Sequence, residues 1–176
     1  MGTQAGDIRL DDIVIRTDLR ARDISRVIQL HGSLYAQEYG YGFAFESYVS
    51  AGLYEFLKNY DPDRSRFWLC EHAGSLVGCL CLMDRGEAAQ LRFFLVRPGY
   101  RGLGLGRHLL DEFCSFMQSC GYASAYLWTT HELAAAAHLY SACGFRIEEE
   151  KTSNAFGKTV VEQKYIKRLS GAPPGT

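Results

Sequence analysis

The sequence lacks the features that mark membrane, secreted and nucleic-acid-binding proteins. Its longest purely apolar runs, such as 93–96, fall far short of the roughly 20 residues that a membrane-spanning helix needs. The formal net charge of -1 gives no overall attraction to nucleic acid or to an anionic membrane. The start of the chain has neither the basic residues nor the apolar stretch of a secretory signal. These absences predict a soluble, cytoplasmic protein with no nucleic acid and no membrane among its partners.

Metal-binding cysteine patterns are also missing. The chain has 6 cysteines, but no two of them have the two-residue separation of a zinc knuckle. Each cysteine lies among apolar residues of a regular segment, which is typical of small core residues in a reducing compartment. Cys79 and Cys81 would share one face of a strand, because successive side chains alternate. The sequence therefore predicts core thiols and no metal site.

What the chain does have is enough apolar residues for one ordinary globular domain. It has 176 residues, of which 47% are hydrophobic and 22% charged, so it can bury a sizeable core. No internal repeat and no linker divides it. We expect a flexible N-terminus over 1–7, a single domain over 8–169 and a flexible tail rich in glycine and proline over 170–176.

The apolar residues of this domain recur with the period of a helix in some segments and of a strand in others. The expected strands cover 13–16, 66–71, 75–83, 90–96, 125–128, 145–150 and 160–169, the second to fourth forming an antiparallel meander. The expected helices end at Gly40, cover 45–57, end at Gly121, and run from a capping box at Thr129 and Glu132 to Gly144. The order β-α-α-β-β-β-α-β-α-β-β predicts an α/β (α+β) fold, with a mixed, mostly antiparallel sheet of about seven strands flanked by helices.

A glycine-rich segment, Arg101-Gly102-Leu103-Gly104-Leu105-Gly106-Arg107, joins the meander to the next helix. Free N–H groups at a helix start, the positive end of the helix dipole and nearby arginines make a cradle for a phosphate ester. A nucleotide P-loop is excluded, since Lys and Ser or Thr do not follow Gly104. A dinucleotide fingerprint is excluded too, since Arg107 stands where its last glycine is needed. A turn that only caps the helix remains an alternative.

Two motifs together resemble the GNAT superfamily of N-acetyltransferases. Arg101-Gly102-Leu103-Gly104-Leu105-Gly106 matches its Arg/Gln-x-x-Gly-x-Gly/Ala signature, and Leu139-Tyr140-Ser141-Ala142-Cys143-Gly144-Phe145 is similar to its Leu-Tyr-x-x-x-Gly-Phe. The element order is also that of the superfamily, so the resemblance spans 8–169. Details around Leu127 and Phe156 look like the GNAT half of proteins that join it to a MarR-type regulator, although this chain carries no DNA-binding half. The resemblance implies a GNAT-like fold and acetyl-CoA as the cosubstrate.

The resemblance also implies where acetyl-CoA would bind. Main-chain groups of Phe94, Leu95 and Val96 would hold the pantetheine arm as one strand holds another. The pyrophosphate would lie on the glycine segment, which comprises Arg101, Gly102, Leu103, Gly104, Leu105, Gly106 and Arg107. Tyr140 matches the proton donor of the superfamily, and a phenol with an ordinary pKa near 10 is protonated at neutral pH. The alternative is that the Tyr140 ring only packs against the CoA arm.

The acceptor site is implied less directly. In the superfamily it lies over the first two helices and the last hairpin, which here contribute Glu38, Tyr39, Tyr41, Glu46, Trp128 and Phe156. Aromatic rings and carboxylates together could hold an ammonium group. A well-packed helix junction with solvated carboxylates explains the same residues. A general base cannot be carried over, because Leu127-Trp128-Thr129 stands where many members have a Glu, and the capping box already explains Glu132.

The resulting hypothesis is an N-acetyltransferase that moves an acetyl group from acetyl-CoA to a primary amine of a small molecule or peptide. Tyr140 would give a proton to the departing CoA thiolate. The alternative hypothesis is a non-catalytic acyl-CoA-binding regulatory module. The sequence leaves open whether the protein forms a homodimer, and neither hypothesis needs a metal ion.

Overall fold

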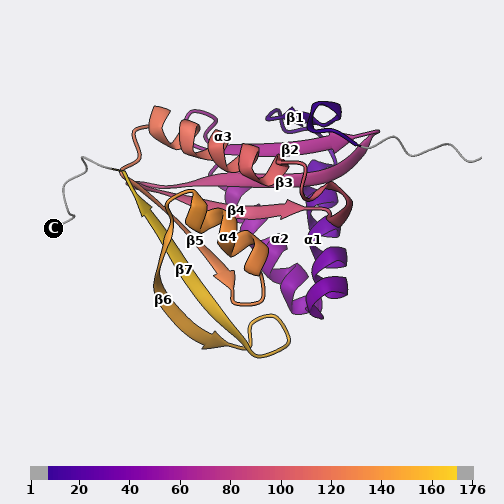
Figure 1. Cartoon of the computed structure of the whole chain (residues 1–176), viewed down its shortest axis with the longest axis vertical. Helices are drawn as coiled ribbons and strands as arrows, with labels where there is room; N and C mark the ends of the chain where they lie inside the picture. The colour runs from indigo at the N-terminus through magenta and orange to yellow at the C-terminus, as the bar shows by residue number, and fades with distance from the viewer. Residues whose placement is uncertain (1–7, 170–176) are drawn as a thin grey trace, which may run out of the picture.

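The computed structural model describes residues 8–169, so the expected flexible ends, 1–7 and 170–176, lie outside the described part. One seven-stranded sheet has the order β1-β2-β3-β4-β5-β7-β6 (Figure 1). Its strands are β1 (Val14–Arg16), β2 (Arg66–His72), β3 (Ser75–Arg85), β4 (Ala88–Val96), β5 (Ser124–Thr130), β6 (Arg146–Ser153) and β7 (Val160–Arg168). The α-helices of the described part are α1 (Asp23–Tyr39), α2 (Phe43–Lys58), α3 (Leu105–Ser119) and α4 (Ala134–Ala142). The mixed, mostly antiparallel sheet and the element order are those predicted.

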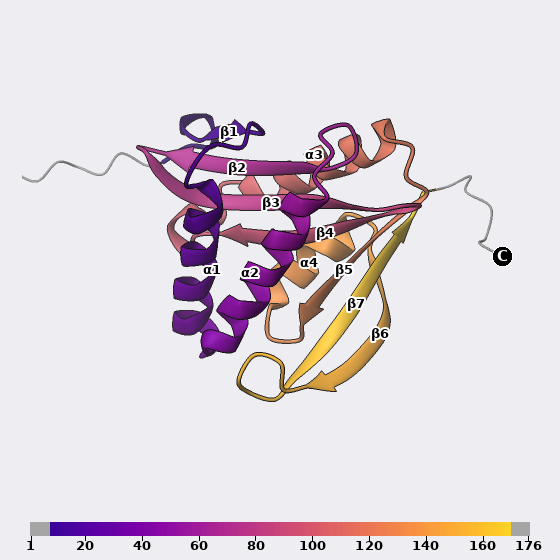
Figure 2. The same ribbon diagram turned by 180° about the vertical axis from the view of Figure 1, so that it is seen from behind.

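Helices cover both faces of the sheet. α1 and α2 lie on one face, and α3 and α4 lie on the other (Figure 1 and Figure 2). In α3 the apolar residues recur every three or four positions, so one stripe faces the sheet. That stripe is fully or almost fully buried and consists of Leu105, Leu109, Leu110, Phe113, Phe116 and Met117. At roughly 1.5–3 kcal/mol for each large apolar side chain, this burial fixes α3, and the loop before it, against the sheet.

Strand β4 changes partners along its length, and this change opens the sheet. Beside β5 it pairs in parallel only over Ala88, Ala89 and Gln90. Further along, its register with β3 shifts between Cys79 and Cys81, and Phe93 adopts a left-handed backbone with φ 53°. Such a bulge bends a strand and increases its twist. Beyond Gln90, β4 therefore diverges from β5 and presents an edge that β5 does not pair.

The main-chain groups of Val96 point into this opening. Arg97 donates its N–H to the Val77 carbonyl at 2.9 Å, which ties that end of β4 to β3. The neighbouring pair, Gly78 and Val96, is then a non-hydrogen-bonded pair of the antiparallel ladder. Since the polar groups of such a pair face away from the partner strand, the N–H and C=O of Val96 face the gap between β4 and β5.

The capping box expected at Thr129 and Glu132 is wrong. Strand β5 continues through Thr130, which pairs with Glu162 of β7, and α4 starts only at Ala134, with Leu133 as an N-cap that has no side-chain cap. The Glu132 carboxylate instead accepts hydrogen bonds from Lys158 Nζ at 2.6 Å and from the Tyr41 hydroxyl at 3.1 Å. Long-range pairing of β5 with β7 therefore overrode a local helix-start signal.

The cysteines are only in part the core residues that were predicted. All are free thiols, and Cys70, Cys79 and Cys81 are buried in the sheet. Burial raises the pKa of the Cys70 thiol to about 12, so it stays protonated. The remaining cysteines, Cys114, Cys120 and Cys143, are partly exposed.

Candidate active site

A cavity of about 520 Å³ lies between the glycine segment, β4, the end of α1 and the start of α4. All three predicted pantetheine-binding residues line it, and so do most of the predicted pyrophosphate-binding ones. Its lining consists of Leu34, Tyr35, Glu38, Tyr39, Phe94, Leu95, Val96, Arg101, Gly102, Gly104, Gly106, Arg107, Leu133, Ala135, Ala136, His138 and Leu139. Leu103 and Leu105 do not line it, and the Leu105 side chain is buried in the core. We call this space the donor cavity.

The glycine segment gives the donor cavity the properties of an anion site. Gly102 and Gly104 have φ angles of 78° and 88°, a left-handed backbone that a Cβ would strain. The first N–H groups of a helix have no intrahelical partner. In α3 the N-cap is Gly104, so no side chain caps these groups. A Cβ on Gly106 would lie 3.0 Å from Leu139 Cδ1, so this wall has no room for a larger residue. Free N–H groups at a helix N-terminus, reached over glycines, suit a pyrophosphate.

Arg101 links this segment to α1. Its Nε donates to the Val96 carbonyl at 3.0 Å, and its terminal nitrogens donate to the Glu38 carboxylate at 2.7 and 2.8 Å. These hydrogen bonds hold the pKa of Glu38 below its usual range. Glu38 and Tyr39 were predicted to bind the acceptor, but the structure places them on the donor cavity. Arg107 pairs with Asp111 one turn along α3, at 3.0 Å.

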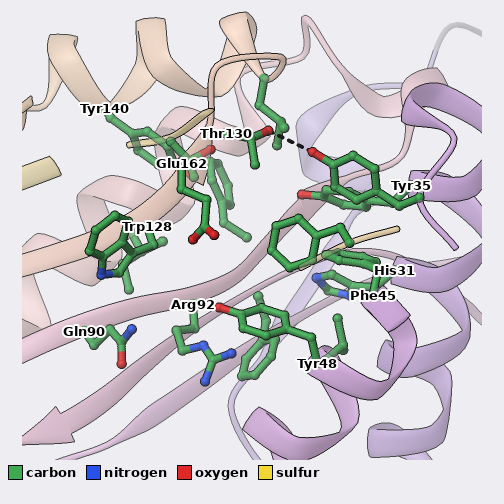
Figure 3. A pocket seen from close by; sticks show the side chains of 18 residues that line it. His31, Tyr35, Phe45, Tyr48, Gln90, Arg92, Trp128, Thr130, Tyr140 and Glu162 are labelled. Carbon is green, nitrogen blue, oxygen red and sulfur yellow. Dashed lines mark hydrogen bonds between the residues drawn. The ribbon is translucent and has the colours of Figure 1, made fainter. Parts of the chain in front are cut away.

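A second, smaller cavity of about 100 Å³ lies on the α1 and α2 side of the sheet (Figure 3). The predicted acceptor residues Tyr41, Trp128 and Phe156 all line it. Its further lining residues are His31, Tyr35, Phe45, Tyr48, Val49, Gln90, Leu91, Arg92, Phe93, Phe94, Thr129, Thr130, Leu133, Tyr140 and Glu162. Glu46 lines neither cavity, because its exposed side chain lies over Gly32 of α1. We call this space the acceptor cavity.

The two cavities meet where Tyr35, Phe94 and Leu133 line both. Tyr140 lies beside this junction, with its ring centroid 5.9 Å from that of Phe94, and lines the acceptor cavity. The Tyr140 side chain is 4% exposed, and burial raises its pKa above the ordinary value. The phenol is therefore fully protonated at neutral pH and can donate a proton next to the junction.

The acceptor cavity is also lined by Gln90, Arg92 and Glu162, which were not predicted from the sequence. An isolated arginine in the apolar run 91–96 was a usable signal, since arginines are seldom placed in buried strands without a reason. Glu162 gave no such signal. It faces the cavity because β7 pairs with β5 in a register that sets it opposite Thr130.

His31 contributes a neutral ring to the wall of the acceptor cavity. Its Nδ1 lies 2.9 Å from the Val27 carbonyl, which can only accept, so Nδ1 carries the proton and Nε2 is left as an acceptor. Burial, helped by the nearby positive charge of Arg92, lowers the pKa of His31 to about 4. The ring therefore stays uncharged at neutral pH.

A hydrogen-bonded group fixes the wall of the acceptor cavity beside Tyr35 and Leu133. The Tyr41 hydroxyl lies 2.9 Å from Thr130 Oγ1, as the dashed line in Figure 3 shows, and it also donates to Glu132. Lys158, from the loop between β6 and β7, donates to both Glu132 and the Tyr39 carbonyl. These contacts join α1, β5 and the last hairpin, so three separate segments hold the aromatic wall in place.

Comparison with known proteins gives the family to which this fold belongs. A profile of the acetyltransferase (GNAT) family matches residues 32–145. An uncharacterized N-acetyltransferase of Schizosaccharomyces pombe is 30% identical over 130 residues, which is 72% of this chain and 78% of that protein. This chain belongs to the acetyltransferase (GNAT) family, and acetyl transfer is the general activity of that family.

Solved structures share the fold at lower identity. An acetyltransferase from Streptococcus agalactiae has a TM-score of 0.72 and 18% identity, and the match covers 91% of this chain and 100% of that one. A GNAT acetyltransferase from Elizabethkingia anophelis, crystallised with acetyl-CoA bound, has a TM-score of 0.63 and 16% identity, with 90% and 99% of the two chains covered.

Two features, a membrane-spanning helix and a metal-binding cluster, are absent from the described residues. Over 8–169, no helix has both the length and the apolar character needed to cross a membrane. The same part of the chain has no group of three or more His, Cys, Asp or Glu side chains arranged to hold a metal ion.

Proposed function

We propose that this protein transfers an acetyl group from acetyl-CoA to a primary amine of a small molecule or peptide, by direct attack of the amine. The observation that carries the proposal is the junction of the two cavities at Tyr35, Phe94 and Leu133, with Tyr140 beside it. A donor on one side and an acceptor on the other can meet there without a covalent enzyme intermediate.

The donor cavity suits two parts of acetyl-CoA, the pyrophosphate and the pantetheine arm. The uncapped N-terminus of α3 and the left-handed Gly102 and Gly104 would hold the pyrophosphate. The unpaired edge of β4 would hold the pantetheine arm through main-chain hydrogen bonds. Bound in this way, acetyl-CoA would supply the activated acetyl thioester. The relative from Elizabethkingia anophelis, which shares this fold, has acetyl-CoA bound.

Residues of the two cavities would then polarise the thioester and transfer the protons. The Val96 N–H, which faces the gap between β4 and β5, would polarise the thioester carbonyl. The amine nitrogen forms the new bond to the carbonyl carbon, and its proton passes to the Glu162 carboxylate, directly or through water. As the carbon–sulfur bond breaks, the Tyr140 hydroxyl gives its proton to the thiolate sulfur.

Replacing Tyr140 by Phe separates an enzyme from a non-catalytic acyl-CoA-binding module. We expect kcat for CoA release, measured with acetyl-CoA and a panel of amines, to fall about 100-fold, since a positioned general acid contributes roughly 100- to 10,000-fold. The Kd of acetyl-CoA, measured by calorimetry, should stay within about twofold, because Tyr140 does not line the donor cavity.

Tyr165→Phe is the matched control. Tyr165 is also buried, its ring lies 5.7 Å from that of Tyr140, and it lines neither cavity. The control should keep its full rate. A wild-type rate in Tyr140→Phe would reject Tyr140 as the proton donor. Tight acetyl-CoA binding without CoA release on any amine would favour the binding module instead.

A further inference from the structure

The acceptor cavity holds two opposite charges that do not neutralise each other. Arg92 reaches it from β4 and Glu162 from β7 (Figure 3). The ion pairs within 4.0 Å among residues 8–169 do not include one between these two side chains. A cavity with separated charges of both signs is complementary to a ligand that also carries both.

Arg92 is held in place but keeps its hydrogen-bond donors free. Its side chain is 11% exposed, and its guanidinium carbon lies 5.1 Å from the centre of the Tyr48 ring and 4.7 Å from that of Phe93. The nearest carboxylate, Glu55, is 3.8 Å away and hydrogen-bonds to Arg85 instead. Within the described residues, Arg92 makes no side-chain hydrogen bond, so its planar donor fork is free to take an anion.

Gln90 adds a second donor on the same strand. It is 8% exposed and lines the acceptor cavity. Arg85 Nε donates to Gln90 Oε1 at 2.7 Å, which uses the carbonyl oxygen of the amide and leaves its NH₂ group for the cavity. Arg92 and Gln90 together make a donor pair on β4 that suits a carboxylate or a similar oxyanion.

Glu162 supplies the opposite end of the site. Its side chain is 15% exposed, and its cation partner is the ammonium group of Lys151 at 3.9 Å, a weak contact with a side chain that is 53% exposed. Trp128 lies on the same face of the sheet, because its neighbour across the strands, Lys164, is two residues from Glu162. The Lys151 ammonium also lies 4.4 Å from the centre of the Trp128 ring, so this carboxylate and indole already attract one exposed ammonium group, which an acceptor amine would have to displace.

We propose that the acceptor is a small amino-acid-like molecule, in which a short carbon chain joins a primary amine to a carboxylate or another acidic group. Arg92 and Gln90 bind the acidic group, and Glu162 binds the amine and orients it toward the junction with the donor cavity. This inference rests on the acetyltransferase activity proposed above and names the substrate class for it.

Other amines fit these walls less well. A diamine or polyamine would bring a second positive charge against Arg92, whose ion pair with Glu55 is long, at 3.8 Å, and is shared with Arg85. A neutral, singly aminated molecule would leave the guanidinium of Arg92 without a partner after water is displaced. Only an acceptor that carries an anion satisfies both ends of the cavity.

The test compares acids with their amides, which match in shape and differ in charge, and adds polyamines. Purified protein is assayed for CoA release with acetyl-CoA and, in turn, L-alanine, β-alanine and L-glutamate, the α-amide of L-alanine and of L-glutamate, the amide of β-alanine, and putrescine and spermidine. We expect kcat/KM for the best acid to exceed that of its amide at least tenfold, since a charge-assisted bidentate contact is worth about 10- to 100-fold. Arg92→Gln should remove most of this preference, mainly through KM, and Arg92→Lys should restore part of it.

The outcomes test the substrate class and the acetyltransferase activity separately. Turnover of diamines or amides in preference to acids would overturn the substrate class and leave the acetyltransferase activity standing. An equal loss on acids and amides in Arg92→Gln, with acetyl-CoA affinity and melting temperature retained, would also overturn it. Failure to bind acetyl-CoA in calorimetry would overturn the proposed function itself.

Discussion

Gly52→Ala should change acceptor recognition without replacing any residue that contacts a substrate. Gly52 lies in α2, and a Cβ built on it would be 2.5 Å from both terminal nitrogens of Arg92. Ordinary contacts between such atoms are about 3.5 Å or longer, so the guanidinium would have to move by about 1 Å. The absence of a side chain at Gly52 therefore leaves the space in which the Arg92 guanidinium lies.

The two consequences of this change have different sizes. Alanine stabilises a helix interior by about 1 kcal/mol relative to glycine, while displacing Arg92 from the Tyr48 and Phe93 rings costs about 0.5–1 kcal/mol. Global stability should therefore change by less than about 1 kcal/mol. A binding group misplaced by about 1 Å can cost roughly 100-fold in rate, so we expect kcat/KM for acidic acceptors to fall about 10- to 100-fold.

The assay is steady-state CoA release with an amino acid acceptor, accompanied by urea unfolding and by calorimetry with acetyl-CoA. The Kd of acetyl-CoA should not change, because neither Gly52 nor Arg92 lines the donor cavity. Ser47→Ala, on the exposed side of the same helix, serves as the control. If Gly52→Ala folds stably and its KM for the acceptor stays within about twofold of wild type, then acceptor binding does not depend on the position of Arg92, and the reasoning is refuted.

The remaining predictions concern the glycine segment and His31. Gly104→Ala should weaken acetyl-CoA binding and cost about 1–2 kcal/mol of stability, since φ is 88° there; Gly99→Ala, which has open space and no positive φ, should do neither. Because the pKa of His31 falls from 6.5 to about 4 on folding, the unfolded chain binds a proton between these values that the folded chain does not, and stability falls as pH falls. From pH 7 to pH 5 this loss should be about 2 kcal/mol in urea unfolding. His31→Phe should lack this loss of stability. A pH slope equal to that of the wild type in this variant would contradict the assignment of the loss to His31.

Local signals were sufficient for most of the fold. The period of the apolar residues predicted α3 and the meander, because in both cases one face of an element packs on its neighbours in the chain. Glycines at positions 40, 121 and 144 predicted helix ends, and all three have positive φ angles. The capping box failed because Thr130 and Glu162, which are far apart in the sequence, pair across the sheet.

The same distinction explains which parts of the site could be predicted. The predicted phosphate cradle is continuous in sequence, so its residues could be named together from their order in the chain, and most of them line one cavity. The acceptor cavity combines α1, α2, β4, β5 and β7, and only the fold brings Arg92 and Glu162 into one space. A residue such as Glu162, in a strand with several other polar residues, carries no local mark of its role.

The division of the site into two cavities has a consequence for how such a protein can diverge. Among residues 8–169, only Tyr35, Phe94 and Leu133 line both spaces. If the protein acts as proposed, substitutions elsewhere on the acceptor wall, on α2 or β7, would exchange one amine for another without changing the residues that bind acetyl-CoA. A lineage with this architecture would then explore new acceptors by single steps, each of which leaves a protein that still binds its acetyl donor.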